Sequence, residues 1–261
     1  MSYPGGKSGA GIYQTIINQI PPHEVYIEPF LGSGAILRKK AAAICSIGVD
    51  SDRKVINSFL KNPISGLTIF CDDALHFLSI YPWTGREFVY CDPPYLMETR
   101  SSKKRIYHDE FSSPAQHLEL LTILKAISAA VMISGYPSNL YFSELSHWRS
   151  ISYRSITRSS RTAIEYLWMN YPEPYTLHDY RYVGANFRER ERIKRRQHRW
   201  RSRLEKMNHL ERAALLMAIK DLGTATPNLA LRDPRIPSSI KSIEAQDPIT
   251  QFNDGGPEPN I

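Results

Sequence analysis

The first two-thirds of the chain alternates between short apolar runs and stretches with helical spacing. The apolar runs are of strand length and cover residues 25–27, 44–49, 67–71, 88–91 and 130–134. Helical patterns lie between them at residues 35–43, 52–60, 74–78 and 114–129. Because strands and helices alternate, the pattern predicts an α/β fold, with a mostly parallel sheet covered by helices on both faces.

Two further apolar runs follow at residues 149–157 and 163–170, and only a turn-rich link separates them. Parallel strands need a long crossover, whereas antiparallel strands can be joined by a short turn. These runs therefore predict an antiparallel hairpin at one edge of the sheet.

The pattern changes abruptly after the sequence Tyr-Pro-Glu-Pro at residues 171–174. Residues 187–207 form a predicted arginine-rich helix that packs by one apolar stripe, which consists of Ile193, Trp200, Leu204 and Met207. A second helix is predicted over residues 209–222, because Asn208 and Glu211 resemble a capping box and Gly223 can end a helix.

Three segments follow from this change of composition. Residues 1–175 form the predicted α/β domain, and residues 176–224 form a basic helical hairpin. Residues 225–261 are rich in proline and lack apolar periodicity, so we expect a poorly ordered tail.

The net charge of +7 is concentrated in the predicted hairpin. Residues 176–224 contain 13 lysines and arginines against 6 aspartates and glutamates, an excess equal to the charge of the whole chain. The remainder is neutral. A basic arm on a neutral body is typical of a protein that binds the phosphates of a nucleic acid, although charge alone gives no sequence specificity.

Composition argues against several other classes of protein. No apolar run approaches the roughly 18 residues of a membrane span, and the N-terminus lacks the apolar core of a signal peptide, so we expect a cytoplasmic protein without a membrane partner. Cys45, Cys71 and Cys91 form no CxxC pair, which favours small core residues of strands over disulfides or zinc ligands. The His-Asp-Glu sequence at residues 108–110 cannot easily converge on one ion, and no metal is expected.

One predicted strand ends in a sequence suited to holding an amino group. The run at residues 88–91 leads into Asp92-Pro93-Pro94-Tyr95, which places a carboxylate and an aromatic ring at the carboxyl edge of the sheet. Asp92 and the carbonyl of Pro93 can accept the two hydrogens of an exocyclic amine, while Tyr95 stacks on its ring. Accepting both hydrogens localises the nitrogen lone pair and makes the amine nucleophilic. An ordinary turn is the alternative, since Asp-Pro is common there.

A glycine-rich turn follows the first predicted strand. The sequence Glu28-Pro29-Phe30-Leu31-Gly32-Ser33-Gly34 leads into a helix, and its glycines allow a ligand to approach the backbone. It lacks the third glycine of the dinucleotide fingerprint, so a plain tight turn is the alternative. Asp50 ends the second strand, where a carboxylate can bind ribose hydroxyls. Asp50 or Asp52 can instead cap the next helix.

The N-terminal sequence Tyr3-Pro4-Gly5-Gly6-Lys7-Ser8 invites comparison with a phosphate-binding loop. That loop needs a glycine where Met1 stands and a strand before it, so a Walker A site is not expected. We favour a glycine turn that presents Lys7 to a carboxylate and Tyr3 to an aromatic ring. A flexible terminus is the alternative.

In this order along the chain, YPGGK, EPFLGSGA and DPPY resemble the motifs of the Dam-like family of DNA adenine N6-methyltransferases, which use S-adenosylmethionine. The resemblance spans residues 2–170. It implies a class I methyltransferase (Rossmann-like) sheet of seven strands, with the cofactor across the first strand ends and a flipped adenine in the DPPY pocket. It also implies DNA as partner and requires no metal, because position and electrostatics suffice for an in-line methyl transfer.

The resemblance further implies roles for individual residues. Asp92-Pro93-Pro94-Tyr95 would be the catalytic motif and Asp50 would hold the ribose of the cofactor. Asp73, with Asp72 as the alternative, would lie near its adenine. The remaining cofactor contacts would come from Tyr3, Gly6, Lys7, Glu28, Pro29, Phe30, Gly32 and Gly34.

The chain departs from the family in one respect. Dam-like enzymes carry a sizeable target-recognition domain between the ribose-binding residue and the later acidic motif, but only a short helix and a strand separate Asp50 from Asp73. Base recognition must therefore be weak or lie elsewhere, in a basic loop or in the arginine-rich helix. The candidate DNA contacts are Arg100, Lys103, Lys104 and Arg105 in the loop, and Arg192, Arg195, Arg196 and Arg199 in the helix. A surface connection and a solvated charge run are the alternatives.

Two other functions stay open. Transfer to the N4 of cytosine is one, although such enzymes more often have serine in place of Asp92. The other is a nucleic-acid-binding protein with an inactive methyltransferase body. The intact motifs argue against it, and the missing recognition domain argues for it.

Overall fold

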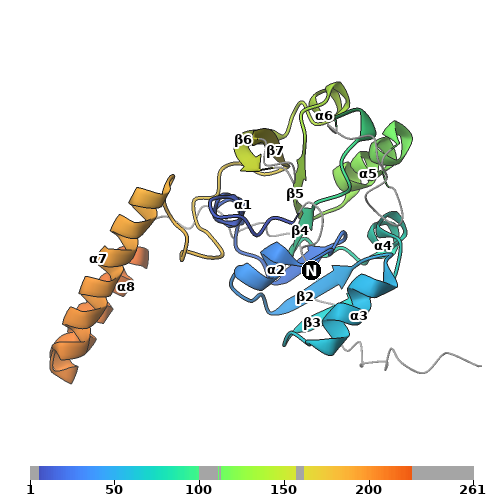
Figure 1. Ribbon diagram of the computed structural model, residues 1–261. Coiled ribbons are helices and arrows are strands. Elements are labelled where there is room, and N and C mark those ends of the chain that lie inside the picture. The colour runs from blue at the N-terminus through green and yellow to red at the C-terminus, as the bar shows by residue number, and fades with distance from the viewer. Residues whose placement is uncertain (1–5, 100–110, 112, 157–161, 225–261) are drawn as a thin grey trace, which may run out of the picture. The chain divides into compact units, whose positions relative to one another are not determined.

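The computed structural model describes residues 6–99, 111, 113–156 and 162–224 (Figure 1). Seven strands form one sheet in the order β3-β2-β1-β4-β5-β7-β6. They are β1 (Val25–Glu28), β2 (Cys45–Val49), β3 (Leu67–Phe70), β4 (Glu87–Cys91), β5 (Ala130–Gly135), β6 (Arg149–Ile156) and β7 (Thr162–Met169). β7 is antiparallel to both of its neighbours, and all other pairs are parallel. The predicted α/β sheet and its edge hairpin are thus confirmed.

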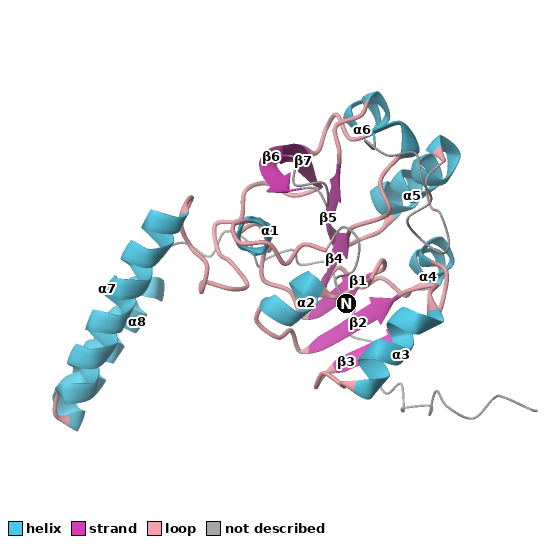
Figure 2. Ribbon diagram, viewed as in Figure 1, coloured by secondary structure: helices cyan, strands magenta, loops and turns pink. Residues whose placement is uncertain are grey.

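Helices cover both faces of the sheet (Figure 2). Those of the sheet region are α1 (Ile12–Ile17), α2 (Ala35–Lys39), α3 (Arg53–Lys61), α4 (Ala74–Ile80), α5 (Pro114–Ala126) and α6 (Asn139–Glu144), with a short 3₁₀ turn at Met97–Thr99. The sequence pattern did not predict α1 or α6. Each has only six residues, too few to show a helical period.

The two layers of helices enclose two apolar clusters. Ile16, Ile36 and Phe59 of α1, α2 and α3 pack on one face of the sheet. Phe77 and Tyr141 belong to the opposite cluster, to which α4, α5 and α6 contribute. Every residue of the central strand β4 is buried, so the chain that follows it starts from the middle of the core.

The three cysteines differ in their surroundings. Cys91 is buried at the end of β4 and Cys45 is partly buried at the start of β2. Cys71 lies just beyond β3 and is exposed, so the expectation of three core cysteines was wrong for this residue.

Two long helices follow the sheet, α7 (Phe187–Lys206) and α8 (His209–Thr224). Asn208 accepts a hydrogen bond from the backbone of Glu211, as the predicted cap requires, at 2.9 Å. Gly223 lies inside α8 and does not end it, contrary to the prediction. No residue of α7 is fully buried. Ile193, Leu204 and Met207 of the predicted apolar stripe are partly buried, whereas Trp200 is 53% exposed and departs from the prediction.

By its contacts the chain divides into two compact units, Met1–Arg201 and Ser202–Ile261. Among the helices that the structure describes, none is both long enough and apolar enough to cross a membrane.

Candidate active site

The acidic residues predicted from separate motifs meet at one edge of the sheet. β1, β2 and β4 are parallel neighbours, and Glu28 of β1 pairs in register with Gly48 of β2. Asp50 follows the end of β2, and Asp92 follows the end of β4. In a parallel sheet the carboxyl ends of strands share one edge, where open α/β sheets bind ligands.

Asp50 ties the glycine-rich turn to the end of β2. Its carboxylate accepts the backbone N–H of Gly32 at 2.8 Å and that of Asp52 at 2.9 Å. Asp52, not Asp50, caps α3 by accepting the N–H of Lys54 at 2.8 Å. Since a carboxylate offers about four acceptor positions, these two bonds are compatible with further donation from ribose hydroxyls.

Gly34 is required where the turn enters α2. It has a φ of 59°, in the left-handed region, and a Cβ there would lie 2.7 Å from the Phe59 ring. Phe59 is buried and cannot move aside. We expect Gly34→Ala to lower the free energy of unfolding by about 2–4 kcal/mol, from backbone strain and overpacking together.

Urea denaturation measures this loss, and Gly11→Ala is the matched control. Gly11 also has a positive φ, of 90°, but a Cβ there meets no atom within 4 Å. Its substitution carries strain alone and should cost about 1–2 kcal/mol. Equal losses at the two positions would contradict the assigned role of the Phe59 contact.

The side chain of Glu28 is enclosed within the protein. It is 3% exposed and accepts a hydrogen bond from Tyr26 at 2.9 Å. Burial raises the pKa of its carboxyl to about 8, and the nearby charge of Asp92 adds to that rise. The next residue, Pro29, is buried, and Phe30 packs edge to face on Phe111 with ring centroids 5.3 Å apart.

The structure places the other predicted cofactor residues as follows. Asp73 is exposed and caps α4, accepting the backbone N–H groups of Leu75 and His76 at 2.9 and 3.0 Å. Asp72 lies 2.9 Å from the ring of His76. Gly6 is exposed, and Tyr3 lies outside the described residues.

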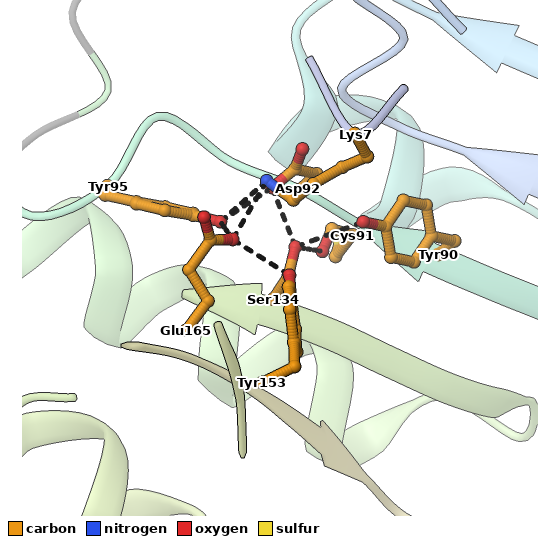
Figure 3. A network of polar contacts seen from close by, with 8 residues as sticks. All are labelled: Lys7, Tyr90, Cys91, Asp92, Tyr95, Ser134, Tyr153 and Glu165. Atoms are coloured by element: carbon orange, nitrogen blue, oxygen red, sulfur yellow. Dashed lines mark hydrogen bonds and ion pairs between the residues drawn. The ribbon is translucent and has the colours of Figure 1, made fainter. Parts of the chain in front are cut away.

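Lys7 lies beside the DPPY motif (Figure 3). Its ammonium donates to Asp92 Oδ1 at 2.8 Å and to the Tyr95 hydroxyl at 2.7 Å. The carboxylate that the N-terminal glycine turn was expected to meet is therefore Asp92. Lys7 was assigned to the cofactor by resemblance, and its side-chain contacts here are with the catalytic motif.

A second carboxylate, Glu165 of β7, completes this group and was not found from the sequence. It accepts the hydroxyls of Tyr95 at 2.7 Å and Tyr153 at 2.8 Å, and it lies 3.3 Å from Lys7 (Figure 3). The available signal was its position as the one charged residue in the otherwise apolar run 163–169. A charge in a buried strand is costly unless it is paired.

The contacts of Asp92 are one-sided. Lys7 at 2.8 Å, the Ser134 hydroxyl at 2.7 Å and the Tyr95 hydroxyl at 3.3 Å all meet Oδ1. Oδ2 has no hydrogen bond or ion pair with any residue that the structure describes. The Asp92 side chain is 18% exposed, against 5% for Lys7, so a ligand can reach it.

The electrostatic surroundings of the three charges differ. Burial raises the pKa of the Asp92 carboxyl, and Lys7 opposes that rise. Burial alone would also raise the pKa of Glu165, but Lys7 and the hydroxyl donors outweigh it and the pKa lies below its ordinary value. Burial would lower the pKa of Lys7, yet the two carboxylates raise it above its usual range. The lysine therefore stays charged, and Asp92 is the more easily protonated carboxylate.

Two tyrosine rings border the motif. The rings of Tyr95 and Tyr136 lie edge to face with centroids 4.6 Å apart, and Tyr136 directly follows β5. The second ring supplies an aromatic wall at the same edge of the sheet.

The candidate DNA contacts fall into two groups. Arg100, Lys103, Lys104 and Arg105 lie outside the described residues. Arg195, Arg196 and Arg199 of α7 are exposed, whereas Arg192 pairs with Glu189 at 3.3 Å. Within the described part of the chain, no three or more His, Cys, Asp or Glu side chains are grouped so as to hold a metal ion.

Comparison with solved structures found proteins that are similar at low sequence identity. A precorrin 8w decarboxylase from Methanobacterium thermoautotrophicum is 11% identical, with a TM-score of 0.41, over 64% of this chain and 92% of that one. A dimethyladenosine transferase from Plasmodium falciparum is 12% identical, with a TM-score of 0.41, over 63% of each chain. A putative methyltransferase from Streptococcus mutans, solved with SAH, is 11% identical, with a TM-score of 0.39, over 60% and 94%.

Comparison with curated proteins found no significant match. Comparison with family models matched residues 45–164 to the D12 class N6 adenine-specific DNA methyltransferase. The matched segment runs from the start of β2 into β7 and contains Asp50, Asp73 and the DPPY motif, whereas Lys7, the glycine-rich turn and Glu165 lie outside it. Together with the seven-stranded sheet expected of a class I methyltransferase, this match confirms the resemblance to the Dam-like DNA adenine N6-methyltransferases that the three motifs predict.

Proposed function

We propose that this protein transfers the methyl group of S-adenosylmethionine to the N6 amino group of adenine in DNA. The family match supports a methyltransferase. The observation that carries the finer proposal is the one-sided environment of Asp92, in which three protein groups hold Oδ1 and the partly exposed side chain presents its second oxygen as an acceptor.

The charges of the pocket fit this cofactor. Asp92 and Glu165 bring two negative charges and Lys7 brings one positive charge, so the group is net negative. Such a group attracts a cation, and the cofactor supplies an electrophilic methyl group on a positively charged sulfur. Asp50 and the Gly32 backbone at the neighbouring strand ends would hold its ribose and its main chain.

The residues of this chain orient the target amine and accept the proton that it releases. Lys7 and Ser134 fix Asp92 through Oδ1, so that Oδ2 can accept one amino hydrogen of the target base. The carbonyl of Pro93 would accept the other, and the lone pair is then localised on nitrogen. As the nitrogen becomes positively charged, Asp92 stabilises that charge and takes the proton that is released.

A base in a duplex cannot reach this buried edge, so the protein must unstack it, at a cost of a few kcal/mol. Tyr95 and Tyr136 present aromatic surface for the extruded base. The proposed division into a transferase domain at residues 1–175, a DNA-binding hairpin at 176–224 and a tail at 225–261 accords with this function.

Transfer of labelled methyl groups tests the proposal. Purified protein is incubated with labelled S-adenosylmethionine and DNA, and the DNA is digested to nucleosides and separated. We expect the label in N6-methyldeoxyadenosine. Label in N4-methyldeoxycytidine would overturn the base assignment, and binding of the cofactor with no transfer to any DNA would overturn catalysis.

The arginines of α7 give a separate prediction about DNA binding. Replacement of Arg195, Arg196 and Arg199 by glutamine removes three exposed charges. If each contacts a phosphate, the slope of log K against log salt becomes shallower by about 3. Fluorescence anisotropy of labelled duplex DNA at several salt concentrations measures it.

A matched variant replaces Arg53, Lys54 and Lys61 of α3 by glutamine. These residues are also exposed, and the loss of net charge is the same. We expect a nearly unchanged slope for this control. Similar slopes for the two variants would show that α7 is not the phosphate-contacting element.

A further inference from the structure

Glu165 reaches the active edge because of the direction of β7. β7 runs antiparallel to β5, and Tyr166 pairs in register with Gly135, the last residue of β5. Glu165 therefore stands one residue beyond the carboxyl end of β5, at the edge where Asp92 follows β4. Tyr153 of β6 is its partner in register. An antiparallel strand thus brings a carboxylate to an edge that is otherwise built from the carboxyl ends of parallel strands.

The partners of Glu165 overlap with those of Asp92. Glu165 contacts Lys7 and Tyr95, and both of these groups also contact Asp92 Oδ1. A buried carboxylate with a purely structural role would need only to satisfy its own lone pairs. Glu165 satisfies them with Lys7 and Tyr95, the same groups that contact Oδ1 of the proposed catalytic carboxylate, Asp92.

The distances around the Tyr95 hydroxyl indicate which group donates each hydrogen bond between Asp92, Lys7 and Glu165. The hydroxyl has one proton, and its 2.7 Å bond to Glu165 is much shorter than the 3.3 Å approach to Asp92. With that proton directed to Glu165, the oxygen of Tyr95 accepts from Lys7 at 2.7 Å. Lys7 then directs another N–H to Asp92 at 2.8 Å. A continuous chain of hydrogen bonds thus links the two carboxylates: Lys7 donates to Asp92 and to Tyr95, and Tyr95 donates to Glu165.

We infer that Glu165 is a positioning residue for the proposed transfer, one that fixes the Tyr95 hydroxyl and the Lys7 ammonium so that Asp92 Oδ1 is held and Oδ2 is the oxygen that accepts the amine. The inference rests on the proposed function. It adds to that function a residue on β7 that lies one position beyond the matched segment.

The charge of Glu165 also affects the protonation of Asp92. Its negative charge raises the pKa of Asp92, and Lys7 lowers it. Glu28 is a third ionisable group near Asp92, and burial raises its pKa to about 8, so its carboxyl is neutral at lower pH. The tyrosine and cysteine side chains near Asp92 have raised pKa values and stay neutral near pH 7; they are Tyr26, Tyr90, Cys91, Tyr95, Tyr136, Tyr141 and Tyr153.

The variant Glu165→Gln keeps the shape of the side chain and removes its charge. We expect kcat to fall by about 10- to 100-fold with KM values for DNA and cofactor changed by less than about 3-fold. Activity needs ionised Asp92, so the acid limb of the plot of kcat against pH follows the pKa of the Asp92 carboxyl. The limb should move to lower pH when the neighbouring negative charge is removed.

Two further variants separate charge from position. Glu165→Asp keeps the charge but shortens the reach to Tyr95, so the acid limb should stay in place while kcat falls. Glu24→Gln removes the charge of an exposed carboxylate that precedes β1 and pairs with Arg86, so both the limb and kcat should stay near those of the wild type. A lower kcat in Glu165→Gln with no movement of the limb would indicate a merely structural role and overturn the inference.

The closing measurement does not depend on methyl transfer. The protein is labelled with ¹³C at aspartate carboxyls, and the Asp92 signal is assigned as the one that Asp92→Asn removes. Its titration should shift to lower pH in Glu165→Gln and stay unchanged in Glu24→Gln. If the wild type transfers no methyl group, the proposed function fails, and this titration still decides whether Glu165 acts on Asp92. An unchanged titration in Glu165→Gln overturns the inference.

Discussion

Replacement of Asp92 by alanine should abolish methyl transfer while the protein stays folded. The change removes the acceptor that localises the amine lone pair and the group that takes its proton. Loss of one such electrostatic contact typically lowers kcat by on the order of 10²–10³-fold, and loss of the proton acceptor adds to it. We therefore expect at least about a 10³-fold decrease. Incorporation of labelled methyl groups at saturating cofactor measures it.

The fold should tolerate this substitution because Lys7 keeps a second carboxylate at 3.3 Å and the Tyr95 hydroxyl at 2.7 Å. Circular dichroism and cofactor binding confirm that each variant is intact. Glu24→Ala is the matched control, since Glu24 is an exposed carboxylate before β1 that pairs with Arg86 at 3.2 Å. Transfer by Asp92→Ala within about 10-fold of the wild type would contradict the proposed mechanism.

The strands could be predicted from the sequence because their signal is local. β4 is buried at every position, and its apolar run predicted both its existence and the edge where Asp92 stands. α1 and α6 could not be predicted, since six residues give fewer than two helical turns. The end of α8 was misplaced because a glycine only lowers the helical preference, and neighbouring residues carried the helix past Gly223.

The candidate site could be predicted only as far as each motif acts by itself. Asp50 and Asp92 were found because each directly follows a strand. Lys7 and Asp92 are separated by 85 positions in the sequence, and Tyr95 and Glu165 by 70. Whether such residues meet depends on the strand order, and in particular on the insertion of β7 between β5 and β6. No local pattern encodes that order, so Glu165 was missed.

Lys7 pairs with both Asp92 and Glu165, so its replacement should have the second large effect, a loss of both stability and activity. Lys7→Met leaves Asp92 and Glu165 buried together without their shared cation. Breaking a buried pair by removing one partner typically costs 3–5 kcal/mol, and we expect a loss of about that size at pH 8. Methyl transfer near neutral pH should also fall steeply, because the pKa of Asp92 rises when Lys7 no longer lowers it. Lys54→Met, at an exposed position of α3, is the control and should change neither property.

The loss of stability should depend on pH with a definite sign. Burial raises the pKa of the Asp92 carboxyl even when Lys7 is present, and it rises further in Lys7→Met, so the folded state of the variant holds that proton more tightly than the unfolded state. Stability is then retained at low pH and lost as pH rises through the folded pKa values, so the deficit should be larger at pH 8 than at pH 5. Urea denaturation at the two pH values measures it.

The double variant Lys7→Met with Glu165→Gln tests whether these two residues act as a pair. Removing the Glu165 charge should cost stability when Lys7 is present, because an ion pair is lost, and should restore stability when Lys7 is replaced, because a repulsion is relieved. The resulting coupling free energy should be about 1–3 kcal/mol at pH 8 and smaller at pH 5. Additive losses at both pH values would mean that the 3.3 Å contact between Lys7 and Glu165 contributes nothing to stability. A positive coupling would show that the ion pair of Lys7 with Glu165 stabilises the group of charged residues around Asp92.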